Sequence, residues 1–254
     1  MADSLAEITN FVGVIDSGVG GLTVLKDLQE KFPQCNFLYL ADSAYCPYGV
    51  RPFEQIFDRI CALVEYLVSR GACAIVLACN TASVFADRLR KKFSIPIYDV
   101  IAPTCKLVVD DTKSKRVALL ATNATVKSGI YKRNLPDSGI AVVSFPCSTF
   151  VPFVEQNSID TADCDEAIRV ALHDLPRCEV DCIILGCTHF PVLKNKIAPY
   201  VNGAKIIQCR TDFQPIFSSS ENYSKTLFFT TGVGKNADFA SHWYGKTNFN
   251  HLDL

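Results

Sequence analysis

VDCIILGCTHFP, at residues 180–191, predicts the fold more directly than any other segment. Its apolar run, residues 182–185, ends abruptly at Gly186. Three residues with reactive or polar side chains follow at once: Cys187, Thr188 and His189. This pattern predicts a buried strand that carries polar chemistry at its end. Because the ligand crevice of an open parallel sheet lies beyond the carboxyl ends of its strands, we expect these side chains at the mouth of a crevice.

A second stretch repeats this arrangement earlier in the chain. ACAIVLACNTAS, residues 72–83, contains a similar apolar run followed by Cys79, Asn80 and Thr81. When Cys79 is aligned with Cys187, the two apolar runs coincide and a small residue precedes each cysteine. Two strand-end cysteines in matching settings predict one site that both of them share.

The strands that open the two halves also resemble each other. Residues 12–17 (VGVIDS) and residues 117–122 (VALLAT) are apolar runs that end in a hydroxyl side chain, Ser17 in one and Thr122 in the other. Their separation is about the same as that of the two cysteines. The chain is therefore predicted to contain two related α/β halves.

Other segments follow the same α/β pattern. We expect a strand at residues 225–230 and a closing helix at 237–244, after a polar linker at 218–222, to return to the first half and complete its sheet. The remaining expectations are a helix at 82–93, a basic helix that ends at Pro136, a loop through Pro146, Pro152 and Glu155, and a helix at 191–200.

A glycine-rich loop, DSGVGG at residues 16–21, follows the first strand. Glycines let the backbone approach a ligand closely, and the N-terminus of the next helix favours an anion. The loop has neither GxGxxG nor P-loop spacing, so a small carboxylate fits better than a nucleotide. A plain turn in which Asp16 or Ser17 caps the helix fits these residues equally well.

Composition excludes several classes of protein. The 254 residues carry a net charge of -1 and are 49% hydrophobic, as in an ordinary globular protein without the basic excess of a nucleic-acid partner. No run reaches the roughly 18 apolar residues of a membrane span. The 12 cysteines are dispersed and no secretory signal precedes them, so we expect reduced thiols in the cytoplasm.

Two opposed thiols suggest proton transfer. Asp16 and His189 are the neighbours able to orient or exchange protons, and two acid/base groups on opposite sides of one carbon can invert a stereocentre. Other chemistries also fit the residues. Cys187 and His189 could act as nucleophile and base, although the second cysteine would then have no role. A zinc site lacks a second pair of ligands, and both thiols could be core residues.

Four motifs together resemble the cofactor-independent aspartate/glutamate racemase family: DSGVGGLTVL at 16–25, PYG at 47–49, CNTAS at 79–83 and GCTHFP at 186–191. The resemblance extends from about Val12 to Gly245. It implies an α/β fold with two pseudo-symmetric parallel-sheet domains and the active site in the cleft between them. We assign residues 1–98 and 210–254 to the first domain, which carries Cys79, and residues 99–209 to the second, which carries Cys187.

The resemblance also implies the reaction, an interconversion of L- and D-glutamate without pyridoxal phosphate, any other cofactor or a metal. Cys79 and Cys187 would be the catalytic acid/bases, assisted by Asp16 and His189. The glutamate site would be lined by residues that match the family motifs: Asp16, Ser17, Tyr48, Gly49, Asn80, Thr81, Thr122, Thr125, Thr188 and His189. The product would be D-glutamate for bacterial peptidoglycan, and a homodimer is the expected form of any assembly.

Two features depart from the family pattern. Ala44-Tyr45-Cys46 replaces a more usual Thr or Ala, Arg and an aliphatic residue, and Gln208-Cys209-Arg210 stands where an Asp-Ser helix start is common. Two other functions stay open, an aspartate or broad-specificity racemase of the same family and a non-catalytic binding protein that keeps the crevice. One methylene is worth only about 1–3 kcal/mol of discrimination, so the sequence does not separate the two racemases. The presence of both thiols argues against the binding protein.

Overall fold

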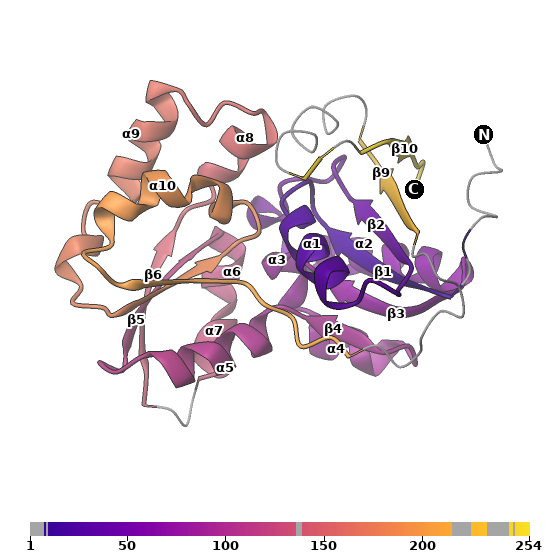
Figure 1. The fold of residues 1–254 in the computed structure, drawn as a ribbon, viewed down its shortest axis with the longest axis horizontal. Coiled ribbons are helices and arrows are strands. Elements are labelled where there is room, and N and C mark those ends of the chain that lie inside the picture. The colour runs from indigo at the N-terminus through magenta and orange to yellow at the C-terminus, as the bar shows by residue number, and fades with distance from the viewer. Residues whose placement is uncertain (1–7, 9, 136–138, 215–224, 233–243, 246) are drawn as a thin grey trace.

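The computed structural model describes residues 8, 10–135, 139–214, 225–232, 244–245 and 247–254, which form two lobes side by side (Figure 1). Sheet A is six-stranded, in the order β10 (Phe249–His251), β9 (Thr226–Thr230), β2 (Phe37–Ala41), β1 (Phe11–Asp16), β3 (Ala72–Leu77) and β4 (Ile97–Asp99). Sheet B is four-stranded, in the order β6 (Ala141–Pro146), β5 (Arg116–Ala121), β7 (Cys182–Gly186) and β8 (Lys205–Gln208). The strand pairs of both sheets are parallel, which confirms the predicted fold class.

The two sheets share one topology. The order β2-β1-β3-β4 in sheet A corresponds strand for strand to β6-β5-β7-β8 in sheet B. The strand that precedes Cys79 therefore lies beside the opening strand of its sheet, as does the strand that precedes Cys187. This equivalence confirms the repeat seen in the sequence.

The chain returns to sheet A near its end. As predicted, residues 226–230 join this sheet, where β9 pairs with β2 (Figure 1). Strand β10 beside it was not expected. The predicted linker at 218–222 lies outside the described residues, as does the closing helix apart from Tyr244, and the domain boundaries stay a prediction.

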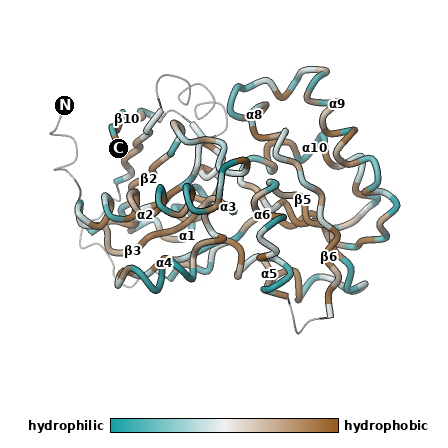
Figure 2. Tube along the Cα trace, turned by 180° about the vertical axis from the view of Figure 1, so that it is seen from behind, coloured by the Kyte–Doolittle hydropathy of each residue, from teal (hydrophilic) through white to brown (hydrophobic). Residues whose placement is uncertain are grey.

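Helices cover both faces of each sheet. On sheet A, α1 (Leu22–Lys31) packs against Val12 and Val14, while α2 (Phe53–Ser69) packs against Ile15 and Leu77 on the other face. Successive side chains of a strand point to opposite faces, so a strand buried on both sides reads as a continuous apolar run. Figure 2 shows these hydrophobic strands inside each lobe and hydrophilic stretches along the outer helices.

Sheet B is covered in the same way. Helices α8 (Phe150–Glu155), α9 (Ala162–Ala171) and α10 (Lys194–Ile197) contribute to the core cluster that contains Ile183 and Leu185. On the other face, α5 (Ile101–Asp111) and α7 (Ile130–Arg133) contribute to the cluster that contains Ile184. Among the described residues, no helix combines the length and apolar character that a membrane span requires.

Three predicted helices are interrupted. In place of a helix at 82–93, α3 (Asn80–Ser83) begins directly after Cys79, and α4 (Ala86–Lys92) follows a break at Phe85, whose ring packs against Phe53 and Phe57. The basic helix is split into α6 (Asn123–Ser128) and α7 by Gly129, at φ 66°. Residues 190–200 form α10 between two 3₁₀ turns, Phe190–Leu193 and Ala198–Tyr200, each with proline near its start.

The predicted loop through Glu155 is wrong, because residues 150–155 form α8. Pro152 suggested a loop, but it is the third residue of this helix, where the backbone N–H has no partner within the helix. Proline is therefore tolerated there. The helix ends at Glu155, and this position brings the Glu155 carboxylate to His189.

Candidate active site

Both predicted catalytic thiols lie just beyond the ends of equivalent strands. Cys79 follows β3 by one residue and Cys187 directly follows β7, and each residue is only 5% exposed. The Cys79 thiol donates to Ser17 Oγ at 3.6 Å. Burial, with the nearby charge of Asp16, raises the pKa of Cys79 to about 12. This thiol is therefore held in its protonated form at neutral pH.

Cys187 has a different neighbourhood. Its Sγ lies 3.6 Å from Nδ1 of His189, and Nε2 of His189 lies 2.5 Å from Oε1 of Glu155. Burial lowers the pKa of His189, but its hydrogen bonds to Cys187 and Glu155 outweigh burial and hold this pKa well above its usual value. His189 is thus an imidazolium between the sulfur of Cys187 and the carboxylate of Glu155.

Glu155 is a site residue that the sequence analysis missed. Its carboxylate also accepts from the backbone N–H of Val19 at 3.0 Å and so contacts the glycine-rich loop of the other lobe. The local sequence FVPFVEQ contains no sign of this role. A carboxylate at the end of a short helix is recognisable as functional only once His189 is known to face it.

Asp16, in the first lobe, forms another contact with the second lobe near His189. It is fully buried, and its carboxylate accepts from Gly18 N at 2.9 Å and from the Thr188 hydroxyl at 3.1 Å. Burial raises the pKa of Asp16, while the neighbouring His189 lowers it. The structure thereby brings Asp16 together with Thr188 and His189, as predicted from two separate motifs.

Three threonines form a second contact between the lobes. Thr81 Oγ1 lies 3.0 Å from Thr122 Oγ1 and 3.4 Å from Thr125 Oγ1, and the last two hydroxyls are 3.0 Å apart. Thr122 also caps α6, where its side chain accepts from Thr125 N. The predicted site residue Gly49 packs against Thr122, because a Cβ on Gly49 would lie 2.5 Å from Thr122 Cβ.

Two predicted site residues use their polar groups on the protein itself. The Tyr48 hydroxyl donates to Asp42 at 2.6 Å, within a buried cluster that includes the Arg59–Asp42 ion pair. The Asn80 amide is bonded to Tyr131 and Cys209. The roles of both residues in substrate binding stay predictions.

Two glycines allow the lobes to approach this closely. A Cβ on Gly18 would lie 2.1 Å from Glu155 Oε1. A Cβ on Gly20 would lie 2.7 Å from Thr188 Oγ1 and 2.9 Å from the backbone nitrogen of His189. The glycines therefore serve the closure of the site as well as the turn.

Gly20→Ala is expected to reduce kcat/KM by at least about 100-fold, because a displacement of about 1 Å at reacting groups costs that much. Steady-state kinetics and thermal melting would be measured together. Gly71→Ala is the control, since Gly71 has φ 91° and open space around it, so this variant should lose stability without a comparable loss of activity. Full activity of Gly20→Ala would contradict the inferred closure.

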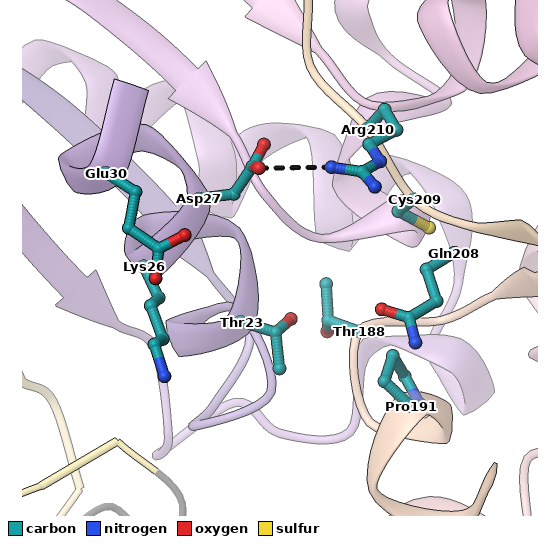
Figure 3. Close-up of a pocket in the computed structure, with 9 residues that line it drawn as sticks. All are labelled: Thr23, Lys26, Asp27, Glu30, Thr188, Pro191, Gln208, Cys209 and Arg210. Atoms are coloured by element: carbon teal, nitrogen blue, oxygen red, sulfur yellow. Dashed lines mark hydrogen bonds and ion pairs between the residues drawn. The ribbon is translucent and has the colours of Figure 1, made fainter. Parts of the chain in front are cut away.

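Cavities lined by Thr188 and by Glu155 border the closed site. One of about 240 Å³ lies between α1 and the segment after β8, and Thr188 and Cys209 belong to its wall (Figure 3). The Asp27–Arg210 ion pair joins the two sides of this cavity at 3.1 Å. The other, of about 500 Å³, is lined by Glu155 and Cys46 among others. No group of three or more His, Cys, Asp and Glu side chains suited to a metal ion occurs in the part of the chain that the structure describes.

Comparison with known proteins agrees with this geometry. Residues 13–210 match the family model for Asp/Glu/hydantoin racemases. The glutamate racemase of Streptococcus gordonii is 35% identical over 260 residues, which cover 96% of this chain and 98% of that protein. The crystal structure of glutamate racemase isoform RacE1 from Bacillus anthracis has a TM-score of 0.88 at 30% identity and covers 96% of this chain and 98% of its own. The Francisella tularensis glutamate racemase, solved with D-glutamate, has a TM-score of 0.84 at 25% identity, with 96% and 98% covered.

Proposed function

Because the chain belongs to the Asp/Glu/hydantoin racemase family and is therefore an amino-acid racemase, we propose that it interconverts L- and D-glutamate by proton transfer between Cα and two cysteines, without a cofactor. The observation that carries this proposal is the pair of buried thiols, Cys79 and Cys187, at equivalent strand ends of two lobes with one topology. The choice of glutamate rests on the names of the relatives and on the structure solved with D-glutamate.

The two thiols differ in a way that suits the reaction. Cys187 beside the His189 imidazolium would be the base that removes the Cα proton, and Cys79, whose pKa is about 12, would be the thiol that supplies one. Glu155 holds His189 in place through its hydrogen bond. The charge of Asp16 interacts with both His189 and Glu155. The resting enzyme would then accept the enantiomer whose Cα–H faces Cys187.

Turnover inverts the stereocentre with every proton accounted for. Cys187 takes the proton from one face of Cα, the electron pair of that C–H bond stays on carbon, and Cys79 delivers its proton to the opposite face. Cys187 ends as a thiol and Cys79 as a thiolate, which is the form needed for the reverse reaction. One pair of groups thereby serves both enantiomers.

Uncharged donors would hold the carboxylates of the substrate. Ser17, Asn80, Thr81, Thr122, Thr125 and Thr188 all lie in or next to the contacts between the lobes. Their polar groups bond to one another or to neighbouring protein groups, and a bound carboxylate would replace part of these bonds. We also propose that the product is D-glutamate for peptidoglycan in the cytoplasm of a bacterium, and that any assembly is a homodimer.

Proton exchange in deuterium oxide tests the proposed function. Purified, metal-free protein is mixed with L-glutamate, and optical rotation and deuterium at Cα are followed. We expect rotation to decay to zero while deuterium enters the D-enantiomer as it forms, because the proton donor carries solvent deuterium. Aspartate in the same assay tests for an aspartate racemase. An absence of exchange with both amino acids would refute racemisation and favour the binding protein.

A further inference from the structure

The amide of Asn80 is held at both ends by residues from the other lobe. Asn80 is the first residue of α3, directly after Cys79, and it is 1% exposed. Its Oδ1 accepts from the Tyr131 hydroxyl at 2.6 Å, and its Nδ2 donates to Cys209 Sγ at 2.9 Å. Tyr131 belongs to α7 and Cys209 directly follows β8, so two distant segments of the chain converge on one side chain.

The bonding pattern of the partners determines the orientation of this amide. The single S–H of Cys209 is donated to the backbone carbonyl of Leu185 at 3.1 Å, which leaves the sulfur as an acceptor for an N–H. The single O–H of Tyr131 needs an acceptor, and Oδ1 is that acceptor. The structure therefore places the –NH₂ end of the amide toward Cys209 and its oxygen toward Tyr131.

An amide nitrogen carries two N–H groups, and Cys209 takes one of them. The second N–H belongs to a residue adjacent to the thiol that supplies or removes the Cα proton. Cys209 also lines the 240 Å³ cavity together with Thr188, so this network borders the predicted glutamate site (Figure 3). A fixed N–H donor in this position suits a carboxylate of an amino acid.

We propose that Tyr131 and Cys209 are positioning residues that orient the Asn80 amide so that its free N–H binds a carboxylate of the substrate. This inference rests on the proposed function, since it assumes that glutamate occupies the site beside Cys79. It also gives a role to Cys209, which lies in one of the two segments that depart from the family pattern. The two hydrogen bonds reach α3 from α7 and from the residue after β8, and so connect the lobes.

The inference predicts an effect on substrate binding that depends on Asn80. Tyr131→Phe removes one hydroxyl, and Cys209→Ala removes both the donor and the acceptor. For each, KM for glutamate is expected to rise about 3- to 10-fold, the effect of one ordinary hydrogen bond, with kcat changed by less than about twofold. Cys209→Ser keeps one donor and one acceptor and should stay within about twofold of wild type.

A double-mutant cycle separates positioning from general stability. In an Asn80→Ala background, Tyr131→Phe and Cys209→Ala should leave KM unchanged, because both act through the missing amide. Tyr66→Phe is the matched control, since the buried Tyr66 hydroxyl has no hydrogen-bond partner among the described residues. Thermal melting of each variant identifies any loss of folded protein, and the Cys209 variants carry the test if Tyr131→Phe does not fold.

Two results would overturn the inference: an unchanged KM in both Tyr131→Phe and Cys209→Ala, or the same rise in KM with and without Asn80. Both presuppose a wild-type protein that racemises glutamate. If wild type fails to racemise it, the proposed function is at fault. If wild type is active and the cycle is additive, the positioning role alone is wrong.

Discussion

Cys79→Ala and Cys187→Ala are each expected to abolish racemisation of glutamate in both directions. The expected loss of kcat is about 10⁴-fold, the upper end of what one positioned acid or base contributes. Each thiol faces one side of Cα in the proposed reaction, and its replacement leaves that side without a proton donor or acceptor. The second thiol cannot compensate, because the two lobes hold the thiols at the ends of different sheets. Polarimetry with each enantiomer measures the loss.

The two variants should differ in hydrogen exchange. Cys79→Ala retains Cys187 and its imidazolium partner, so one enantiomer should still gain deuterium at Cα without changing hand. Cys187→Ala retains a thiol with a pKa of about 12, and exchange should be much slower. Cys164→Ala is the control, because Cys164 is a fully buried core residue of α9. Racemisation at the wild-type rate in either catalytic variant would end the two-base mechanism.

His189→Asn is expected to lower kcat/KM by about 10²- to 10⁴-fold, the usual contribution of a group that assists proton transfer. The variant removes the imidazolium that lies 3.6 Å from the sulfur of Cys187, the base of the proposed reaction. The equilibrium constant between enantiomers is unity, so kcat/KM has to fall by the same factor in both directions. Because its hydrogen bonds hold the pKa of His189 well above its usual value, wild-type activity should fall once the pH rises past that pKa, and the variant should lack this fall.

The exposed His173 supplies the control for this experiment. His173→Asn alters a side chain that is 61% exposed, and both its activity and its pH profile should match wild type. Melting curves report whether His189→Asn stays folded with Glu155 unpaired. A wild-type pH profile at reduced activity would show that His189 acts through packing rather than through its charge.

Much of the site could be predicted from the sequence because its chemistry follows directly after buried strands. The apolar runs before Cys79 and Cys187 are local features, and a parallel sheet places the carboxyl ends of its strands at one edge. The glycine-rich loop and the return of residues 226–230 to sheet A were predictable for similar reasons. Apolar periodicity and strand-end position need no knowledge of distant residues.

The pairing of the candidate catalytic groups depends on contacts between distant parts of the chain. Glu155 and His189 are 34 residues apart, and Asp16 and Thr188 are 172 apart, so no local pattern links them. Tyr48 matched a site motif, yet its hydroxyl is bonded to Asp42 in a buried cluster. A buried polar group must find a partner, and which partner is within reach depends on how the two lobes pack. Local patterns thus predicted the residues that follow buried strands, whereas the presence of Glu155 and the partner of each polar group depend on how the lobes pack.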